Sequence, residues 1–227
     1  MKTAIIVPAY NESSVIASCL MDLRSQLDKD HIVADIIVID DGSSDDTSSV
    51  ARPYCDYLLT HIHNCGLGAA LSTGIEFCRR YGYDNLVTFD SDGQHDAHDI
   101  GKALSMLSKG YDVVIGSRFI GTHSGMPKLR RVILMFGNLV TFLFFGVWSS
   151  DTQSGFRALG KRAIGSLNIK SNRMEVSSEF FGEIHRLGLK FIEIPIHIRY
   201  TAYSLKKGQK NSQSASVLLK LLYRTFS

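Results

Sequence analysis

The first half of the chain alternates short apolar runs with longer amphipathic segments. Runs rich in β-branched residues predict strands at residues 4–8, 35–40, 57–61, 85–89 and 112–116. Between them, apolar residues recur at helical spacing and predict helices at residues 15–27, 67–81 and 100–107. Strands that alternate with helices in this way form a mostly parallel sheet flanked by helices. The pattern therefore predicts an α/β, Rossmann-like fold.

The second half is more apolar and less regular. It predicts a long apolar helix at residues 128–148, a short strand at 154–159, an amphipathic helix at 174–187 and a strand at 191–200. Lys, Gly, Gln and Ser then dominate residues 204–214, which indicates a mobile loop before an amphipathic helix at 217–226. We expect one α/β domain over residues 1–200, followed by a basic mobile loop and a C-terminal helix over residues 201–227.

Polar residues follow four of the predicted strands at the point where each strand ends. The segments are residues 8–12 (Pro-Ala-Tyr-Asn-Glu), 40–43 (Asp-Asp-Gly-Ser), 64–68 (Asn-Cys-Gly-Leu-Gly) and 90–94 (Asp-Ser-Asp-Gly-Gln). In an open α/β sheet, ligands bind outside the carboxyl ends of the strands. Neighbouring aspartates in such segments repel one another unless a cation or hydrogen-bond donors neutralise them. We therefore expect one ligand site at this edge, with a divalent cation and a diphosphate.

Asp90 and Asp92 are two residues apart at the end of a strand, a spacing that lets both carboxylates face one site. Hard oxygen ligands of this kind, with the amide of Gln94 beside them, suit Mg²⁺ or Mn²⁺ bound together with substrate phosphates. Such a metal would stabilise charge on a nucleoside diphosphate leaving group. Asp and Gly are also common in plain turns, so a turn without a metal is the alternative.

Two other polar segments have competing explanations. Asp41 or Ser43 can cap the N-terminus of a helix, and capping does not exclude ligand binding. Gly66 and Gly68 match part of a dinucleotide-binding fingerprint, but Leu71 stands where the third glycine should fall. The motif also follows the third predicted strand rather than the first, so the sequence disfavours a nicotinamide enzyme.

Histidines and cysteines near these segments indicate no further metal site. The histidines at positions 61, 63, 95 and 98 fit no zinc ligand spacing, and we expect solvated loop residues there. The four cysteines show no CxxC spacing, which predicts neither a zinc site nor a disulfide framework. A reducing cytosol is the simpler location for such a chain.

Charge is distributed unevenly along the chain. The formal net charge of +3 is modest and gives no indication of nucleic acid as a partner. No acidic residue follows Glu193, whereas several Lys and Arg residues do, so the tail is a candidate surface for phosphates or anionic lipid. The longest apolar stretch, residues 132–148, contains Gly137 and Asn138 and is shorter than a bilayer span. We expect a peripheral protein on the cytoplasmic face of a membrane.

Six motifs, in this order, resemble those of the family 2 glycosyltransferases. Four are the polar segments above, and the other two are residues 116–119 (Gly-Ser-Arg-Phe) and 151–157 (Asp-Thr-Gln-Ser-Gly-Phe-Arg). Within that family the set is most similar to the dolichyl- or polyprenyl-phosphate sugar synthases, over about residues 1–210. The resemblance implies a GT-A fold with a membrane-facing helical C-terminal part.

The resemblance also implies roles for individual residues. The nucleotide sugar would be bound by Pro8, Tyr10, Glu12, Asp40, Asp41, Gly68, Asp90, Lys207 and Lys210. Mg²⁺ or Mn²⁺ would be held by Asp90, Asp92 and Gln94. Lys207 and Lys210 belong to a segment similar to one that closes over the diphosphate in relatives, where a loop must both move and neutralise charge.

On the acceptor side, the resemblance points to Arg118 and Arg131, which with Asp92 and Asp151 form the candidate catalytic set. Planar guanidinium groups suit the phosphate of a lipid acceptor. A solvated charge is the alternative for Arg131. Relatives often have a serine where this chain has Met135.

Asp151 corresponds to a carboxylate that such enzymes place near the acceptor. For a hydroxyl acceptor, Asp151 would be the general base, because a hydroxyl loses its proton as it attacks. A lipid phosphate has a second pKa of about 6 and arrives ionised. Asp151 would then orient Arg157 or the metal, or form a structural ion pair.

These features favour an inverting glycosyltransferase that moves a hexose from a UDP- or GDP-linked sugar to polyprenyl phosphate. The alternative within the same fold is a saccharide or lipid hydroxyl acceptor in polysaccharide synthesis. A sugar nucleotidyltransferase is less favoured, because residues 8–12 contain neither glycine nor a basic residue. A non-catalytic lipid-binding module would not need Asp90 and Asp92. Membrane attachment would come from residues 132–148 and the basic tail, or from a separate membrane protein.

Overall fold

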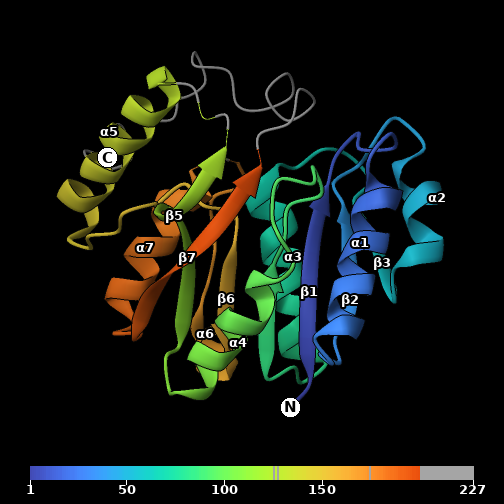
Figure 1. Ribbon diagram of the computed structural model, residues 1–227, viewed down its shortest axis with the longest axis horizontal. Helices are drawn as coiled ribbons and strands as arrows, with labels where there is room; N and C mark the ends of the chain where they lie inside the picture. The colour runs from blue at the N-terminus through green and yellow to red at the C-terminus, as the bar shows by residue number, and fades with distance from the viewer. Residues whose placement is uncertain (125, 127, 174, 200–227) are drawn as a thin grey trace.

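The computed structural model describes residues 1–124, 126, 128–173 and 175–199 (Figure 1). Within these residues, one sheet contains the strands β1 (Thr3–Ala9), β2 (Asp35–Asp40), β3 (Tyr57–Thr60), β4 (Asn85–Thr88), β5 (Val113–Ser124), β6 (Arg157–Gly160) and β7 (Phe191–Arg199). The helices are α1 (Ile16–Lys29), α2 (Thr47–Ala51), α3 (Leu67–Arg80), α4 (Asp99–Ser108), α5 (Lys128–Phe145), α6 (Lys161–Ser166) and α7 (Val176–Arg186), with a 3-10 turn η1 (Arg52–Tyr54). The loop and helix predicted in residues 201–227 lie outside the described residues.

The strand order in the sheet is β3-β2-β1-β4-β6-β5-β7. β1 pairs in parallel with β2 and with β4, and β5 pairs in parallel with β7. β6 runs antiparallel between β4 and β5. The chain moves outward from β1 to β3 and then returns to the other side of β1 at β4, so the strand order reverses there. Such a switch point opens a crevice at the carboxyl ends of the strands.

Helices cover both faces of the sheet, which buries the strands on two sides (Figure 1). Successive side chains along a strand point to opposite faces. β1 accordingly places Ile5 and Val7 in the core under α1 and α4, and Ala4 and Ile6 in the core under α3, α6 and α7. Burial on both sides explains why the strands are continuous apolar runs rather than alternating ones.

The mostly parallel α/β sheet predicted from the sequence is confirmed, with three local differences. The strand predicted at residues 154–159 begins only at Arg157, because the preceding residues form a polar loop. The strand predicted at 112–116 continues to Ser124, since it pairs with β7 on both sides of an irregularity between Ser117 and Thr122. The short helices α2 and α6 contain too few residues to show a helical period in the sequence.

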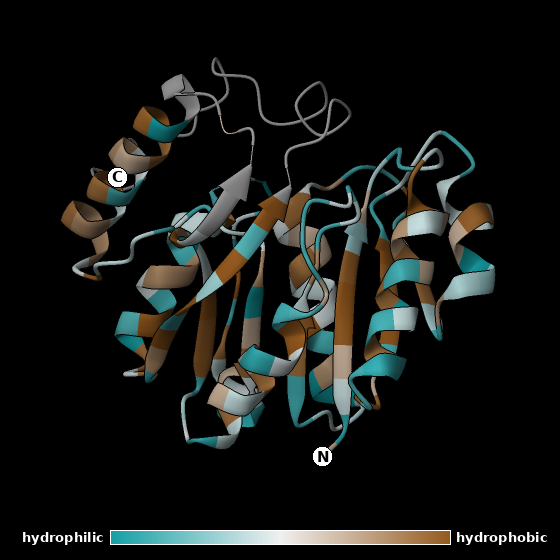
Figure 2. Ribbon diagram, in the orientation of Figure 1, coloured by the Kyte–Doolittle hydropathy of each residue, from teal (hydrophilic) through white to brown (hydrophobic). Residues whose placement is uncertain are grey.

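The helix α5 lies at the end of the molecule beside α7 (Figure 1). It packs closely there, because a Cβ on Gly182 of α7 would lie 2.6 Å from the ring of Phe145. The helix also exposes six large apolar side chains: Val132, Met135, Phe136, Leu139, Phe142 and Leu143. Its ribbon is accordingly largely brown in Figure 2. Among the described residues, no helix has both the length and the apolar character needed to cross a bilayer.

Candidate active site between two cavities

Two cavities meet at the carboxyl ends of the strands, and both are lined by Asp90 and Asp92. The N-terminal cavity, of about 310 Å³, is formed by segments that follow β1, β2 and β3 and includes Pro8, Tyr10, Glu12, Asp41, Asn64 and Gly66. The C-terminal cavity, of about 200 Å³, includes Gln94, His95, Arg118, Leu134, Gln153, Ser154, Gly155 and Arg157. The two carboxylates therefore lie where the cavities join.

The segment after β1 forms one wall of the N-terminal cavity through Pro8, Tyr10 and Glu12. The carbonyl of Glu12 accepts the backbone N–H groups that begin α1, from Val15 at 3.0 Å and Ile16 at 2.9 Å. The N–H of Glu12 donates to the hydroxyl of Thr47 at 2.7 Å. These bonds hold the segment against the loop after β2, whereas the ring of Tyr10 stays exposed at the rim.

Asp40 is buried and supports the loop that follows β2. Its carboxylate accepts the N–H of Ser43 at 3.0 Å and the hydroxyl groups of Ser43 and Ser48. It lines neither cavity. The structure therefore places Asp40 beneath the N-terminal cavity rather than in its wall.

Asp41 holds the loop after β3 against the N-terminal cavity. Its oxygens accept the N–H groups of Cys65 at 2.9 Å and Gly66 at 2.7 Å, and Oδ1 lies 2.7 Å from Nδ1 of His61. The other ring nitrogen of His61 lies 2.9 Å from the hydroxyl of Thr73. Potential metal-ligand atoms of Asp41, His61 and Cys65 lie within 4.8 Å of one another. Because the carboxylate and both ring nitrogens already have partners, we interpret this cluster as a structural clamp.

The glycines of the same loop allow a close approach of two segments. Gly66 has a φ of +104°, and a Cβ there would lie 2.4 Å from the carbonyl oxygen of Asn172. On Gly68, in the first turn of α3, a Cβ would lie 1.9 Å from the carbonyl oxygen of Ser171. Any larger residue at either position would push the two segments apart, so these glycines are required for packing whether or not they contact a ligand.

Asp90 presents its carboxylate toward the cavities, with 38% of the side chain exposed. Its Oδ2 lies 2.9 Å from Nε2 of His95. A Cβ on Gly155 would lie 2.3 Å from the same carboxylate, so only glycine leaves room for it. Asp92 accepts the N–H of Gln94 at 3.0 Å and its side-chain amide at 2.5 Å. The structure thus brings together the three residues predicted to bind metal.

The two carboxylates have opposite pKa shifts. Burial raises the pKa of Asp92, and the negative charge of Asp90 raises it further. Desolvation also disfavours ionisation of Asp90, but the hydrogen bond from His95 and the positive charges of Arg118 and Arg157 lower the pKa of Asp90 below the ordinary value. Two carboxylates that oppose each other's ionisation favour a bound cation, which would remove the repulsion.

Arg118 and Asp151 form a buried bidentate ion pair. Nε and Nη2 of Arg118 each lie 2.6 Å from one carboxylate oxygen, and the N–H of Arg118 donates to Oδ2 at 3.0 Å. Asp151 is 0% exposed and Arg118 is 7% exposed. Asp151 itself lines neither cavity, whereas Arg118 lines the C-terminal one. Asp151 therefore contacts that cavity only through the guanidinium group that it holds.

Arg157 is a second buried cation in the wall of the C-terminal cavity. It donates to the carbonyl oxygens of Ser154 at 3.1 Å and Thr152 at 3.3 Å, and its guanidinium lies 4.4 Å from the ring centroid of Phe180. Burial lowers the pKa of Arg157 to about 10, against the opposing effect of the two nearby aspartates, so it remains a cation at neutral pH. The sequence points to Arg157 only as a partner that Asp151 would orient, although this arginine ends the sixth motif.

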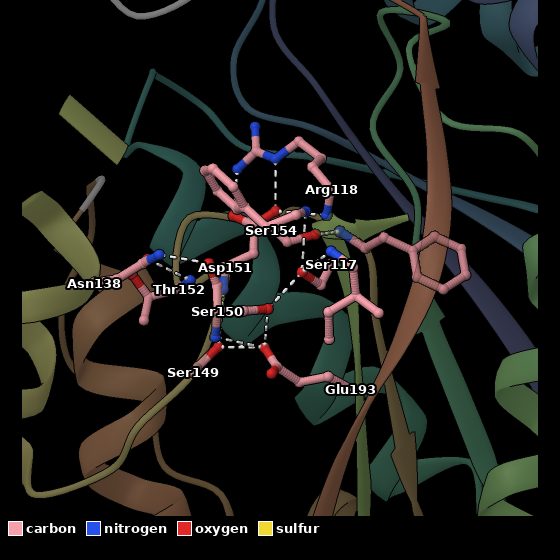
Figure 3. Close-up of polar contacts among 12 residues, drawn as sticks. Ser117, Arg118, Asn138, Ser149, Ser150, Asp151, Thr152, Ser154 and Glu193 are labelled. Atoms are coloured by element: carbon pink, nitrogen blue, oxygen red, sulfur yellow. Dashed lines mark hydrogen bonds and ion pairs between the residues drawn. The ribbon is translucent and has the colours of Figure 1, made fainter. Parts of the chain in front are cut away.

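A polar network supports the loop that carries Asp151 (Figure 3). From α5, the side-chain NH₂ of Asn138 donates to the carbonyl of Ser150. The side-chain oxygen of Asn138 accepts the backbone N–H and the hydroxyl of Thr152, each at 2.9 Å. From β7, Oε1 of Glu193 accepts the N–H of Ser150 at 2.9 Å and the hydroxyl of Ser149 at 2.8 Å. The loop is thus held from both sides, which keeps Asp151 in place beneath Arg118.

Several predicted residues lie elsewhere. Arg131 is exposed on α5 and lines neither cavity, and Lys207 and Lys210 lie outside the described residues. The expectation of solvated loop histidines is wrong for His95, whose side chain is 5% exposed, and for His61, which is largely buried. Their burial depends on neighbours distant in sequence, which the spacing of histidines does not reveal.

The fold and the site together define a class of protein: an α/β protein with a candidate ligand site at the switch point of a mostly parallel sheet. Within that class, residues 4–165 match the sequence profile described as glycosyl transferase family 2. The chain belongs to this family.

Similar proteins agree with this assignment. An uncharacterized protein of Methanocaldococcus jannaschii is 39% identical, over 96% of this chain and 90% of its own length. The UDP-N-acetylglucosamine–dolichyl-phosphate N-acetylglucosaminyltransferase of Methanococcus voltae is 30% identical, over 97% of this chain and 93% of its own. Among solved structures, the glucosyl-3-phosphoglycerate synthase of Mycobacterium tuberculosis, with Mn²⁺, UDP-glucose and phosphoglyceric acid, superimposes with a TM-score of 0.73 at 17% identity, over 97% of this chain and 77% of that one. The fold is therefore GT-A-like.

Proposed function

We propose that this chain transfers a hexose, with inversion, from a nucleotide diphosphate sugar to polyprenyl phosphate at a membrane surface. The observation that carries the proposal is the pair of cavities that share Asp90 and Asp92. An inverting transfer needs donor and acceptor on opposite sides of the sugar, and two joined cavities suit that requirement. The relative from Methanococcus voltae is named for a nucleotide sugar and a dolichyl phosphate, which supports the same substrate classes.

In this proposal the N-terminal cavity binds the nucleotide of a UDP- or GDP-linked sugar. The exposed ring of Tyr10 at the rim offers a surface for the base, and Pro8 and Glu12 line the wall beside it. Asp41 contributes by holding the loop that closes the cavity. Lys207 and Lys210 would neutralise the diphosphate from the adjoining tail.

The carboxylates of Asp90 and Asp92, with the amide oxygen of Gln94, offer the hard oxygen ligands that Mg²⁺ and Mn²⁺ prefer. The raised pKa of Asp92 supports a cation at this place, because a bound cation would relieve the repulsion between the carboxylates. The Mn²⁺ in the glucosyl-3-phosphoglycerate synthase supports a divalent metal in this fold. When bound, the metal would stabilise the negative charge of the departing nucleoside diphosphate.

The C-terminal cavity binds the phosphate of the acceptor. Arg118 and Arg157 bring two buried positive charges to its wall. Both oxygens of Asp151 are engaged by Arg118, so we assign Asp151 to orienting that guanidinium rather than to accepting a proton. A phosphate acceptor arrives ionised and needs no general base, which supports phosphate over a hydroxyl as the nucleophile.

The apolar face of α5 binds the membrane surface that holds the lipid acceptor. The buried side of the same helix contributes Leu134 to the C-terminal cavity, so the helix that carries the apolar face lies beside the proposed acceptor site. Arg131, exposed near the start of α5, would contact anionic headgroups. An amphipathic helix that lies in the interface gives peripheral attachment, on the cytoplasmic face where nucleotide sugars are available.

Transfer from radiolabelled UDP- and GDP-hexoses to polyprenyl phosphate tests the proposal. The full chain is incubated with Mn²⁺ and either polyprenyl phosphate or the matching polyprenol, and labelled glycolipid is extracted and quantified. We expect labelled glycolipid with polyprenyl phosphate and none with polyprenol. Equal transfer to polyprenol or to a saccharide would replace the phosphate acceptor with a hydroxyl one. Formation of a new nucleotide sugar from a sugar phosphate would indicate a nucleotidyltransferase.

A further inference from the structure

His95 is a polar residue in an unusually enclosed position. Its side chain is 5% exposed, and its ring centroid lies 5.7 Å from that of Phe89 and 5.7 Å from that of Phe156. Its backbone forms an antiparallel bridge with Ile198 at the end of β7. The ring contacts Phe156 and the backbone pairs with Ile198, both distant in sequence, so the imidazole has little freedom to turn.

The two ring nitrogens of His95 have different surroundings. Nε2 lies 2.9 Å from Oδ2 of Asp90, whereas the buried Nδ1 has no hydrogen-bond partner within the part of the chain that the structure describes. A buried N–H without an acceptor is costly, whereas a bare ring nitrogen among aromatic rings costs less. The proton is therefore assigned to Nε2, and the Nε2–H group of His95 donates a hydrogen bond to Oδ2 of Asp90.

This hydrogen bond fixes how Asp90 faces the cavities. The carboxylate contacts His95 and lies close to Gly155, and 38% of the Asp90 side chain remains exposed. Carboxylates that bind metals are commonly held by such outer hydrogen bonds, whose loss weakens metal binding by about 10–100-fold. Direct ligation by His95 fits less well, because Nδ1 is enclosed and Nε2 is occupied by Asp90.

We propose that His95 is a positioning residue, which holds the carboxylate of Asp90 in the orientation that receives a divalent cation shared with Asp92. The inference rests on the proposed function through that metal. It adds a residue that sets the affinity of the site without ligating the metal. It also explains why an imidazole is buried against Phe89 and Phe156, where an apolar side chain would pack at lower cost.

Binding of Mn²⁺ in the presence of UDP, measured by titration calorimetry and by the electron paramagnetic resonance signal of free Mn²⁺, tests the role without measuring turnover. His95→Phe retains a ring beside Phe89 and Phe156 and removes the hydrogen-bond donor, so we expect the Kd for Mn²⁺ to rise about 10–100-fold. His95→Gln places an amide N–H near the position of Nε2 and should restore most of the affinity. His95→Asn has a shorter amide that does not reach it and should resemble the Phe variant.

The control variant is His98→Gln, on the same loop. His98 is 63% exposed on its side chain and contacts Gln26 rather than Asp90, so its replacement should leave the Kd unchanged. Each variant is checked by its thermal midpoint without metal. If His95→Phe does not fold, the difference in Mn²⁺ affinity between His95→Gln and His95→Asn still tests the hydrogen bond. Both variants replace the ring by an amide, and only Gln places its N–H near the position of Nε2.

Three groups of results would overturn the proposal, and each group points to a different explanation. Wild-type affinity in folded His95→Phe, or equal affinity of the Gln and Asn variants, would mean that the hydrogen bond does not position Asp90. Complete loss of Mn²⁺ in His95→Gln as well as His95→Phe would make His95 a direct ligand. If the wild type binds no Mn²⁺, or Asp92→Asn binds it equally well, the metal in the proposed function fails and the role of His95 fails with it.

Discussion

The walls of the two cavities are built from different interactions. In the N-terminal wall, carboxylates accept backbone N–H groups and hydroxyls of neighbouring loops, as Asp41 does from Cys65 and Gly66. In the C-terminal wall, buried charges bind each other, as Arg118 and Asp151 do across 33 residues of chain. The first wall is a set of oriented loops, whereas the second is a set of compensated charges. Removing one partner from the second leaves a charge buried without its counterion.

The strongest test of this difference is Asp151→Ala. It leaves Arg118 buried without its counterion, and we expect the free energy of unfolding in urea to fall by about 3–5 kcal/mol. The double variant Arg118→Leu with Asp151→Leu removes both charges and should recover much of that loss. The matched control is Lys161→Ala, which breaks an exposed pair with Asp84 and should cost no more than about 1 kcal/mol. Equal losses in Asp151→Ala and Lys161→Ala would contradict the comparison.

The second test addresses the carboxylates shared by both cavities. Asp92→Asn keeps the shape but halves the charge offered to a cation, and excess chelator removes the cation itself. Each should lower hexose transfer by about 10²–10³-fold, the scale for losing one electrostatic contact at a reacting centre. Asp28→Asn, on the exposed side of α1, serves as the control. Full activity of the wild type in chelator would rule out the metal.

The third test weakens the N-terminal wall without leaving a buried charge. Asp41→Asn replaces one acceptor oxygen by an amide NH₂ group, so the N–H of either Cys65 or Gly66 loses its acceptor. We expect this loss to lower the free energy of unfolding by about 1–3 kcal/mol. We expect faster hydrogen exchange in residues 64–68 and a higher KM for the nucleotide sugar. Asp46→Asn, exposed on the same loop, should change neither. Unchanged exchange in the Asp41 variant would show that the clamp is not needed.

The smallest expected effect lies outside both walls, on the exposed face of α5. Leu143→Ser removes one apolar side chain from the proposed membrane surface and should weaken binding to anionic vesicles by about tenfold, the scale of one partly buried leucine. Ile62→Ser changes an exposed apolar residue at the other end of the molecule and should have no effect in the same sedimentation assay. Equal binding of both variants would place the membrane contact elsewhere.

The same division explains what the sequence predicts. The N-terminal wall comes from short segments that directly follow strands, so periodicity and local motifs predict both the strands and residues such as Asp41 and Asp90. The C-terminal wall depends on contacts between side chains that are far apart in the sequence. The sequence suggests that Asp151 orients an arginine, but the structure pairs it with Arg118 and leaves Arg157 to backbone carbonyls. No local pattern distinguishes those two arginines.

His95 shows the same limit on a smaller scale. Its position directly after the fourth motif is evident from the sequence, but its burial depends on Phe89, which follows β4, and Phe156, which precedes β6, coming together. The antiparallel direction of β6 is equally hidden, because a run of four residues carries no signal of which way it crosses a sheet.

The direction of β6 has a consequence for how the acceptor side can change. Because β6 runs opposite to its neighbours, the chain enters it from the substrate edge, where Arg157 pairs with Thr88. Residues 146–156 therefore connect α5 to β6 along this edge, and six of them are buried: Val147, Ser149, Asp151, Thr152, Ser154 and Phe156. A buried connection of this kind tolerates insertions poorly, because its polar groups depend on partners in α5 and β7. We therefore expect the proposed acceptor preference to change through side chains that line the C-terminal cavity, rather than through the length of this connection.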